Sequence, residues 1–243
     1  MRILLTSGGT KVPIDDVRSI TNMSSGNFGA KIGREILDQR DSLIFLTHKD
    51  GKTPMKTEVN LLDGGLDDVA DKIYWAKSRR ANYQEITYNT FDDYYKQLSE
   101  LILNPPNVVG AVVLAAAVSD YVTKNPARGK VRTSAQMNIE LEPTPKLISK
   151  IRDEWGYKGV LVGFKLLVNA EKSELIDAAR RSVVENGCDF VVANDLRDIK
   201  AGNHRAILVF ENTQYVVSKE EAISEILYNI RKLYRNRIES HAP

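Results

Sequence analysis

The sequence is poor in the side chains that bind metals or attack substrates. Cys188 is the only cysteine among 243 residues, which excludes an intramolecular disulfide framework and a multi-thiolate zinc site. The three histidines, His48, His204 and His241, lack the spacing of metal ligands, and no serine or cysteine nucleophile motif is present. A single thiol fits a reducing interior, so we expect a cytoplasmic protein whose cysteine lies in the core.

The chain also lacks long apolar runs and a strong charge of either sign. No apolar run approaches the roughly 18 residues of a membrane-spanning helix, and MRILLTSGG passes into a glycine turn without the cleavage site of a signal peptide. Its 34 Lys and Arg balance 32 Asp and Glu, so neither nucleic acid nor a membrane is an expected partner. A hydrophobic fraction of 42% predicts a soluble protein with one large domain, residues 1–243.

Short apolar runs alternate with helical patterns along most of the chain. The runs predict strands at 2–7, 42–47, 83–88, 107–118, 159–164 and 189–195. Amphipathic patterns predict helices at 26–37, 66–77, 91–103, 146–155 and 173–187 and at the C-terminus, after a β-hairpin at 205–217. This order predicts an α/β protein, a Rossmann-like three-layer sandwich with a mainly parallel sheet.

Parallel sheets bind ligands beyond the carboxyl ends of their strands. The residues at the predicted ends are Ser7-Gly8-Gly9-Thr10, Thr47, Ser119-Asp120, Phe164-Lys165 and Asn194-Asp195. Asp120 follows the most apolar strand and could ligate a nucleotide-bound Mg²⁺. The alternatives are an exposed turn acid at Asp120 and strand-ending turn chemistry at Asn194-Asp195.

Three glycines fall on one face of the first predicted helix. Gly26, Gly29 and Gly33 are spaced by three and four residues, which suits a helix lying close to a strand. Ser24 or Ser25 could cap that helix, and Gly8-Gly9 with Ser24-Ser25-Gly26 could hold phosphate on backbone amides. The alternative is a tight turn followed by a helix cap. The loop matches neither the dinucleotide nor the P-loop fingerprint, and its length, residues 8–25, suggests a pocket for more than one phosphate-bearing ligand.

A basic segment lies between residues 122 and 138. It carries Lys124, Arg128, Lys130 and Arg132 without an acid and shows no sustained period. We expect a mobile basic flap that closes over a triphosphate, with a solvated charge run as the alternative.

Several motifs together resemble one family. TSGGT, IDDVRSITNMSSGNFG, AAAVSDY, GKVR, GFKLLV and VANDL occur in the order and approximate spacing of phosphopantothenate cysteine ligases of coenzyme A biosynthesis, over about residues 3 to 210. GFKLLV is similar to the stand-alone bacterial enzymes, so we expect no decarboxylase half before Met1. The resemblance implies that CTP with Mg²⁺ converts phosphopantothenate into an acyl-cytidylate, which cysteine then attacks to form an amide, releasing CMP. It also implies a homodimer and a separate flavin-dependent decarboxylase as the next pathway enzyme.

The resemblance assigns roles to individual residues. Asn22 matches the asparagine that holds the acyl carbonyl, and Lys130 the flap lysine that binds phosphate during activation. Asp120 would serve the metal and nucleotide, and Phe164 would pack near the base, beside the strand-end residues Gly8, Gly9, Lys165, Asn194 and Asp195. The substrate-binding set is Arg18, Ser24, Ser25, Gly26, Ala116 and Ala117.

Two departures from the family pattern leave the nucleotide open. Arg132 replaces the second flap lysine, and Leu167 replaces the acid of the G-F-x-x-E-T motif in many fused enzymes. ATP-using eukaryotic relatives also carry F-K-L, so ATP stays an alternative to CTP.

Two other functions remain as alternatives. A nicotinamide-dependent reductase could share this fold, although its glycine fingerprint is missing. A non-catalytic nucleotide-binding regulator would bind nucleotide without producing pyrophosphate.

Overall fold

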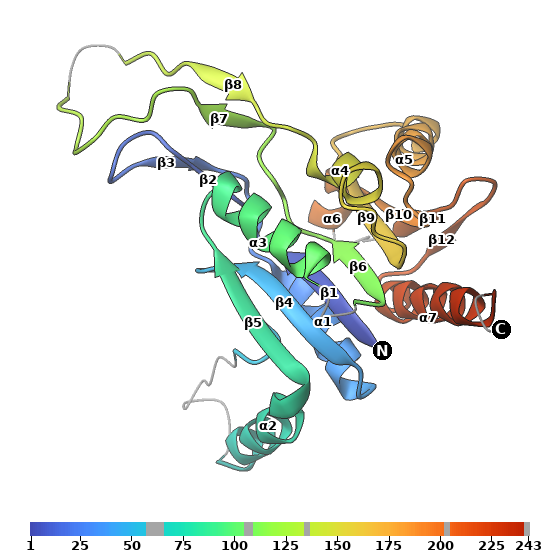
Figure 1. The fold of residues 1–243 in the computed structure, drawn as a ribbon. Coiled ribbons are helices and arrows are strands. Elements are labelled where there is room, and N and C mark those ends of the chain that lie inside the picture. The colour runs from blue at the N-terminus through green and yellow to red at the C-terminus, as the bar shows by residue number, and fades with distance from the viewer. Residues whose placement is uncertain (57–65, 105–108, 134–136, 202–204, 241–243) are drawn as a thin grey trace.

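Eight strands form one sheet in the computed structural model, which describes residues 1–56, 66–104, 109–133, 137–201 and 205–240 (Figure 1). The order across the sheet is β12-β11-β10-β9-β6-β1-β4-β5. These strands are β1 (Arg2–Ser7), β4 (Ser42–His48), β5 (Tyr83–Tyr88), β6 (Ala111–Leu114), β9 (Val160–Leu167), β10 (Phe190–Asp195), β11 (Ala206–Val209) and β12 (Gln214–Val217). The first six are parallel, and the predicted late hairpin β11–β12 adds two antiparallel strands.

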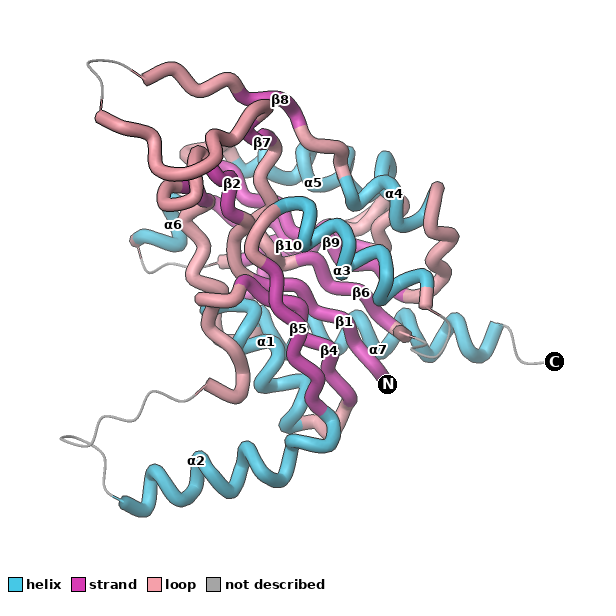
Figure 2. Tube along the Cα trace, turned by 60° about the vertical axis from the view of Figure 1, so that its left-hand side comes forward, coloured by secondary structure: helices cyan, strands magenta, loops and turns pink. Residues whose placement is uncertain are grey.

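Helices cover both faces of the sheet, which confirms the predicted three-layer α/β architecture (Figure 2). One face carries α1 (Asn27–Asp38) and α7 (Ala222–Ser240), and the other carries α3 (Phe91–Leu103), α4 (Leu147–Asp153) and α5 (Lys172–Asn186). Side chains of each strand alternate between the two cores, as in β1, where Ile3 and Leu5 face α1 and Leu4 faces α3.

Three further helical segments lie outside these layers. The predicted helix at 66–77 is confirmed as α2 (Leu66–Arg79), which continues into η1 (Arg80–Asn82) and stands apart from the sheet in Figure 1. The Arg34 guanidinium lies 4.0 Å from the centre of the Trp75 ring and connects α2 to α1. The sequence did not predict α6 (Leu196–Lys200), which follows β10 directly.

The parallel strands are connected in the order of a doubly wound dinucleotide-binding sheet. From β1 the chain moves outward through β4 and β5, and it then crosses back to β6, on the other side of β1, and continues to β9 and β10. The direction reverses between β1 and β6, and ligands of such sheets bind in the crevice at this switch point. The fold therefore places the candidate site where the loop after β1 meets the loop after β6.

Glycines let α1 lie directly against β1 and β4. A Cβ added at Gly29 would lie 2.3 Å from Ser7 Oγ of β1, and one added at Gly33 would lie 3.1 Å from Leu43 Cδ2 of β4. The predicted close approach is therefore present. The predicted capping is wrong: Gly26, with φ of 75°, is the N-cap, and Ser25 Oγ only accepts a 3.3 Å hydrogen bond from the Asn27 amide.

Two small hairpins project from the sheet beside the switch point and form a structure that we call the arm (Figure 1). The first pairs β2 (Lys11–Pro13) with β3 (Ser19–Thr21), within a segment predicted as one loop, and the second pairs β7 (Tyr121–Thr123) with β8 (Leu141–Pro143). The basic segment is the outer loop of the second hairpin, and its residues 134–136 lie outside the described residues.

Acids of the first hairpin connect the two hairpins of the arm. Asp16 Oδ2 accepts from the Gly129 amide at 2.7 Å and Asp15 Oδ2 from the Val131 amide at 3.1 Å. Amide hydrogen bonds from Val17 above all, with those of Val131 and Arg18 and the Arg18 charge, hold the pKa of the Asp15 carboxyl below its ordinary value despite burial. The basic segment is thus tied to the first hairpin through its backbone.

The prediction of a strand over 107–118 is wrong in its extent. Residues 107 and 108 lie outside the described residues, and β6 ends at Leu114. Beyond it, the Ala116 amide donates to Thr6 Oγ1 at 3.2 Å and the Ala117 amide to the Gly8 carbonyl at 2.8 Å. The regular ladder of β6 stops because the Ala116 amide bonds to a side-chain oxygen, and pairing resumes only as the isolated parallel bridge between Gly9 and Ala117, which an apolar pattern cannot indicate.

Cys188 lies in the core on the α5 face, as predicted. Burial raises the pKa of its thiol to about 12. Among the described residues, no helix has the length and apolar character needed to cross a membrane.

Candidate functional site

The loop after β1 and the segment after β6 are hydrogen-bonded to each other at the switch point. Gly8 has φ of 84°, which turns the chain so that its carbonyl accepts from the Ala117 amide. The Ala117 carbonyl in turn accepts from the Thr10 amide at 3.3 Å and from Asn22 Nδ2 at 2.9 Å. Four predicted site residues, Gly8, Gly9, Asn22 and Ala117, therefore lie together.

Asn22 lies at the end of the first arm hairpin with its side chain exposed. A Cβ added at Gly9 would lie 3.0 Å from the Asn22 carbonyl oxygen, so only glycine allows this approach without displacement. The Ser24 amide donates to the same oxygen at 2.8 Å, and the chain reaches Gly26 and α1 within two more residues. The predicted anion site at Ser24, Ser25 and Gly26 is thus continuous with Asn22.

A cavity of about 390 Å³ opens on the other side of the segment after β6. It is bounded by the ends of β6 and β9, by α5, and by the start of α4. Four of the predicted site residues line it: Ala116, Asp120, Phe164 and Lys165. Its floor is apolar and includes Leu98 and Ile148.

Cations from three elements meet at this cavity. Lys165 comes from β9, Arg181 from α5, and Lys146 is the N-cap residue of α4. No ion pair of these three is present in the described part of the chain, and the acids of the lining are Asp120 and Glu185. The excess of positive charge suits a ligand with several phosphate groups.

The sequence did not point to Lys146 or Arg181. For Lys146 a signal existed, because a cation at a helix N-terminus opposes the helix dipole and needs another reason to be there. For Arg181 we find no signal, since it lies within an ordinary amphipathic helix.

The side chains at the ends of β9 and β10 have different surroundings. The Phe164 and Phe28 rings meet edge to face with centroids 6.1 Å apart, which connects the cavity wall to the start of α1. Asn194 is 7% exposed, and its Oδ1 has no hydrogen-bond partner within the described residues.

For Asp195 the structure shows strand-ending turn chemistry, which the sequence analysis gave as the alternative to ligand binding. Its carboxylate accepts from the amides of Ala170 at 2.8 Å and Arg197 at 2.7 Å and caps α6. Although burial acts in the opposite direction, these amides hold the pKa of Asp195 below its ordinary value of 3.8. Nucleotide binding by this side chain remains a prediction.

Two predicted residues lie on the arm rather than in the cavity. Arg18 binds Asp15 Oδ2 at 3.1 Å and the Val131 carbonyl at 3.2 Å, which joins the two hairpins. Lys130 is exposed on the outer loop and does not line the cavity. The basic segment is not free of counter-charge, because Lys124 pairs with Glu140 at 2.8 Å.

Carboxylates are sparse around the site. Nowhere in the described ranges do three or more His, Cys, Asp or Glu side chains gather as metal ligands would. Asp120 therefore offers one carboxylate, which fits a magnesium ion carried mainly by phosphate oxygens and water.

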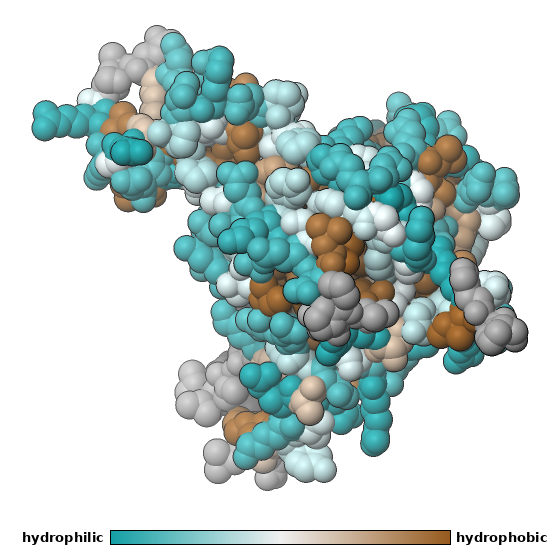
Figure 3. All heavy atoms as spheres, viewed as in Figure 1, coloured by the Kyte–Doolittle hydropathy of each residue, from teal (hydrophilic) through white to brown (hydrophobic). Residues whose placement is uncertain are grey.

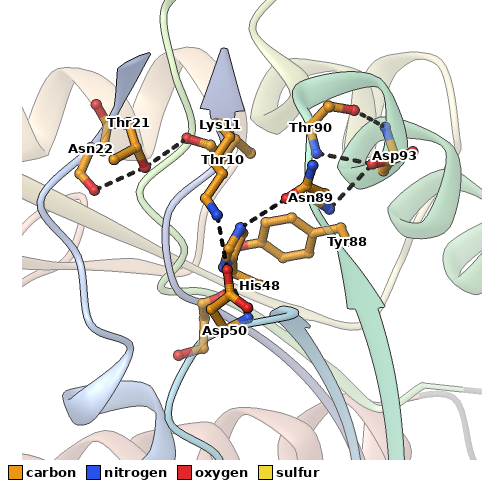
Figure 4. A network of polar contacts seen from close by, with 11 residues as sticks. Thr10, Lys11, Thr21, Asn22, His48, Asp50, Tyr88, Asn89, Thr90 and Asp93 are labelled. Atoms are coloured by element: carbon orange, nitrogen blue, oxygen red, sulfur yellow. Dashed lines mark hydrogen bonds and ion pairs between the residues drawn. The ribbon is translucent and has the colours of Figure 1, made fainter. Parts of the chain in front are cut away.

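A second polar network fixes the loop after β1 from the opposite direction (Figure 4). His48 at the end of β4 contacts Asn89 at 3.2 Å and accepts from the Asp50 amide at 3.1 Å. Lys11 donates its amide to the Asn89 carbonyl at 2.9 Å and its ammonium to Asp50 at 2.8 Å. The loops after β1, β4 and β5 are therefore held together.

Comparison with known proteins identifies the family. The family described as "DNA/pantothenate metabolism flavoprotein C-terminal domain" matches residues 1–63 and 86–233. The chain belongs to this family. The resemblance drawn from the motifs is therefore confirmed at family level, whereas the stand-alone type stays a prediction.

Two similar proteins are named for coenzyme A biosynthesis or for phosphopantothenate–cysteine ligation. The coenzyme A biosynthesis bifunctional protein CoaBC of Thermococcus kodakarensis is 32% identical over 209 residues, 86% of this chain and 44% of that protein. The phosphopantothenate–cysteine ligase of Mus musculus is 28% identical over 254 residues, 90% of this chain and 79% of that protein. The chain thus spans less than half of the first relative and most of the second.

A solved structure of the same family has the same fold. The DNA/pantothenate metabolism flavoprotein of Streptococcus pneumoniae superposes with a TM-score of 0.77 at 29% identity, over 96% of this chain and 99% of that one. The fold of this chain is therefore that of a known structure.

The cavity cations predict binding of inorganic pyrophosphate. Replacing Arg181 by Gln should weaken the affinity of the protein for pyrophosphate by about threefold to tenfold, because one cation is lost. The effect is modest because the site is open to water, which screens the charge. The measurement is isothermal titration calorimetry at fixed ionic strength. Lys150→Gln is the matched control, since Lys150 pairs with Glu154 at 2.5 Å and does not line the cavity. Equal weakening by both substitutions would refute a specific role for the cavity.

Proposed function

We propose that this protein joins phosphopantothenate to cysteine and uses a nucleoside triphosphate to activate the acid. The observation that carries the proposal is the junction at the switch point, where Asn22 and the Ser24–Gly26 loop adjoin a cavity with three cations. Membership of the flavoprotein C-terminal domain family and a similar ligase in mouse support it.

The reaction proceeds in two displacements. In the first, a carboxylate oxygen of phosphopantothenate bonds to the α-phosphorus, and pyrophosphate leaves with the electron pair of the broken bond. In the second, the cysteine amine bonds to the acyl carbon, loses a proton, and CMP or AMP leaves. Activation by the nucleotide makes a protein nucleophile unnecessary, so the protein acts by positioning and by charge.

The described residues divide between the two substrates. The cavity lined by Ala116, Asp120, Phe164 and Lys165 receives the nucleotide, and Lys146 and Arg181 add positive charge for its phosphates. The loop at Ser24–Gly26 takes the phosphate of phosphopantothenate. Ala117, whose carbonyl binds Asn22, then lies between the two substrates.

Asp120 is the residue that would hold Mg²⁺ together with the nucleotide phosphates. When bound, the ion neutralises charge on the phosphate oxygens. The chain's own contributions are the Asp120 carboxylate, the cavity cations and, from the arm, Lys130. We propose that Lys130 binds phosphate during activation.

The nucleotide is proposed to be CTP, with ATP as the alternative. Pyrophosphate release should need phosphopantothenate and a divalent metal but not cysteine, because activation precedes amide formation. The test measures pyrophosphate with CTP and with ATP, each with and without EDTA and cysteine. Release that required cysteine even in a single turnover would contradict the stepwise order. Absence of release with both nucleotides would refute the proposed function.

We further propose that the chain works as a homodimer in the cytoplasm and supplies a separate flavin-dependent decarboxylase. The arm is the candidate dimer surface, since it exposes large apolar side chains, and Figure 3 shows brown patches over it. These exposed residues are Val17, Ile20, Met23, Tyr121, Met137, Ile139 and Leu141. By comparison, the hairpin β11–β12 exposes two large apolar side chains, Tyr215 and Val216.

Light scattering tests the dimer. The protein should have twice the mass of one chain, and Ile20→Glu with Leu141→Glu should convert it to monomers, because burying two carboxylates is costly. Tyr74→Glu on α2 is the control for a charge at another exposed apolar position. A dimer that survives the double substitution would show that the arm does not form the contact.

Asn22→Asp should separate the two displacements. Aspartate removes the amide donor and places a negative charge where oxyanion character develops as cysteine attacks, which typically costs about 10² to 10³ in rate. The acyl-nucleotide should therefore form and accumulate, as seen by mass spectrometry.

The same substitution also removes the bond to the Ala117 carbonyl, so a control for the loop is needed. Thr21→Val removes the neighbouring 3.3 Å hydrogen bond to the Thr10 carbonyl and should leave transfer to cysteine intact. Normal product formation by Asn22→Asp, or a folded variant without acyl-nucleotide, would refute the assignment.

A further inference from the structure

Four residues, His48, Asp50, Asn89 and Lys11, form a unit that we call the histidine clamp. It joins the loops after three adjacent strands, β4, β5 and β1, as the dashed lines in Figure 4 show. The His48 side chain is 8% exposed.

The two ring nitrogens of His48 have different tasks. Nδ1 accepts from the Asp50 amide at 3.1 Å, and since a backbone N–H can only donate, Nδ1 carries no proton. The ring proton is then on Nε2, which donates to Asn89 Oδ1 at 3.2 Å. Only the neutral ring with its proton on Nε2 makes both hydrogen bonds. Protonation of Nδ1 breaks the bond from the Asp50 amide and leaves that nitrogen to pair with the Asp50 carboxylate, whose Oδ2 lies 3.9 Å away.

His48 packs closely against Gly8, in the turn that precedes the Asn22 contact. A Cβ added at Gly8 would lie 2.9 Å from His48 Cβ, and one added at Gly9 would lie 3.0 Å from the Asn22 carbonyl oxygen. His48 therefore contacts the first glycine of a pair whose second glycine contacts Asn22. A second connection leads from Asn89 to the Lys11 amide, at the start of the first arm hairpin, which ends next to Asn22.

We propose that His48 is a positioning residue for Asn22 in amide formation and that it acts only while its ring is neutral. This proposal rests on the proposed ligase function. His48 touches no substrate itself and acts through Gly8, Gly9 and the arm hairpin.

The surroundings of His48 favour the neutral ring. Burial above all, and then the Lys11 ammonium, hold the pKa of His48 below its ordinary value of 6.5, and Lys49 acts in the same direction. Asn89 and Asp50 oppose this shift, and the remaining neighbour, Tyr88, is neutral because burial raises the pKa of its hydroxyl. The His48 ring is thus mostly neutral at pH 6.5 and above, and the hydrogen bond from the Asp50 amide is lost as the pH falls through the lowered pKa.

His48→Gln tests the proposal because glutamine cannot titrate and loses the bond to the Asp50 amide. At pH 8 the variant should slow amide formation by about threefold to tenfold, the value of roughly one hydrogen bond, and slow pyrophosphate release less than twofold. As the pH falls through the lowered pKa of His48, the ratio of wild-type to variant rates should approach one. The cysteine amine titrates equally in both proteins, so this ratio isolates His48.

A second variant and a spectroscopic measurement guard against a general loss of structure. Asn89→Ala keeps the histidine but removes the Nε2 acceptor, and it should slow amide formation by a similar factor. The ¹H–¹⁵N correlations of the His48 ring, assigned by their absence in His48→Gln, should show an Nε2–H tautomer. Circular dichroism should show that both variants fold.

Three results would overturn the proposal. One is a rate ratio that stays constant with pH, another is equal slowing of pyrophosphate release and amide formation, and the third is an Nδ1–H tautomer. If the wild-type protein ligates and one of these is found, His48 alone is wrongly assigned. If the wild-type protein releases no pyrophosphate with either nucleotide, the proposed function fails and the proposal fails with it.

Discussion

The hydrogen bonds between Ala117 and the loop after β1 are the constraint on which the site depends. They form an isolated parallel bridge between Gly9 and Ala117 beyond the end of β6, and this bridge holds the segment after β6 beside the loop after β1. The cavity opens on one side of this segment and the Asn22 loop lies on the other. In the proposed reaction, the two substrates that must meet would lie on either side of this one short piece of backbone.

Glycine makes this arrangement possible at two levels. Gly8 supplies the positive φ that turns the loop, and Gly29 lets α1 approach the strand so closely that its N-terminus lies beside the same loop. The close approach of α1 to the strand therefore lowers the stability of the helix itself, since glycine within a helix costs roughly 0.5 to 1 kcal/mol relative to alanine.

The sequence predicted those parts of the fold that depend on periodicity. The strands at 83–88 and 2–7 and the hairpin at 205–217 were predicted well, because buried strands and turns leave local patterns. The first arm hairpin was missed, since β2 and β3 are three residues long and Ser19–Thr21 is exposed along its length.

For the site, the sequence predicted which strand-end residues line the cavity better than which residues of the helices join them there. The strand-end rule located Asp120, which lies beyond β6, and Phe164 and Lys165, although β9 continues past the predicted end at 164 to Leu167. It could not reveal that Lys146 and Arg181 face the same cavity, since this depends on how α4 and α5 pack. It also could not distinguish Asp195 as a cap from Asp195 as a ligand, because both uses place an acid at a strand end.

The burial of Cys188 has a chemical consequence for a protein proposed to consume cysteine. Free cysteine is in equilibrium with its disulfide, cystine, and an accessible thiolate would exchange with cystine and become blocked. With its pKa raised to about 12 and its sulfur in the core, Cys188 offers no thiolate to that exchange or to an activated acyl group. The chain's own thiol therefore does not compete with the thiol-bearing substrate that it is proposed to acylate.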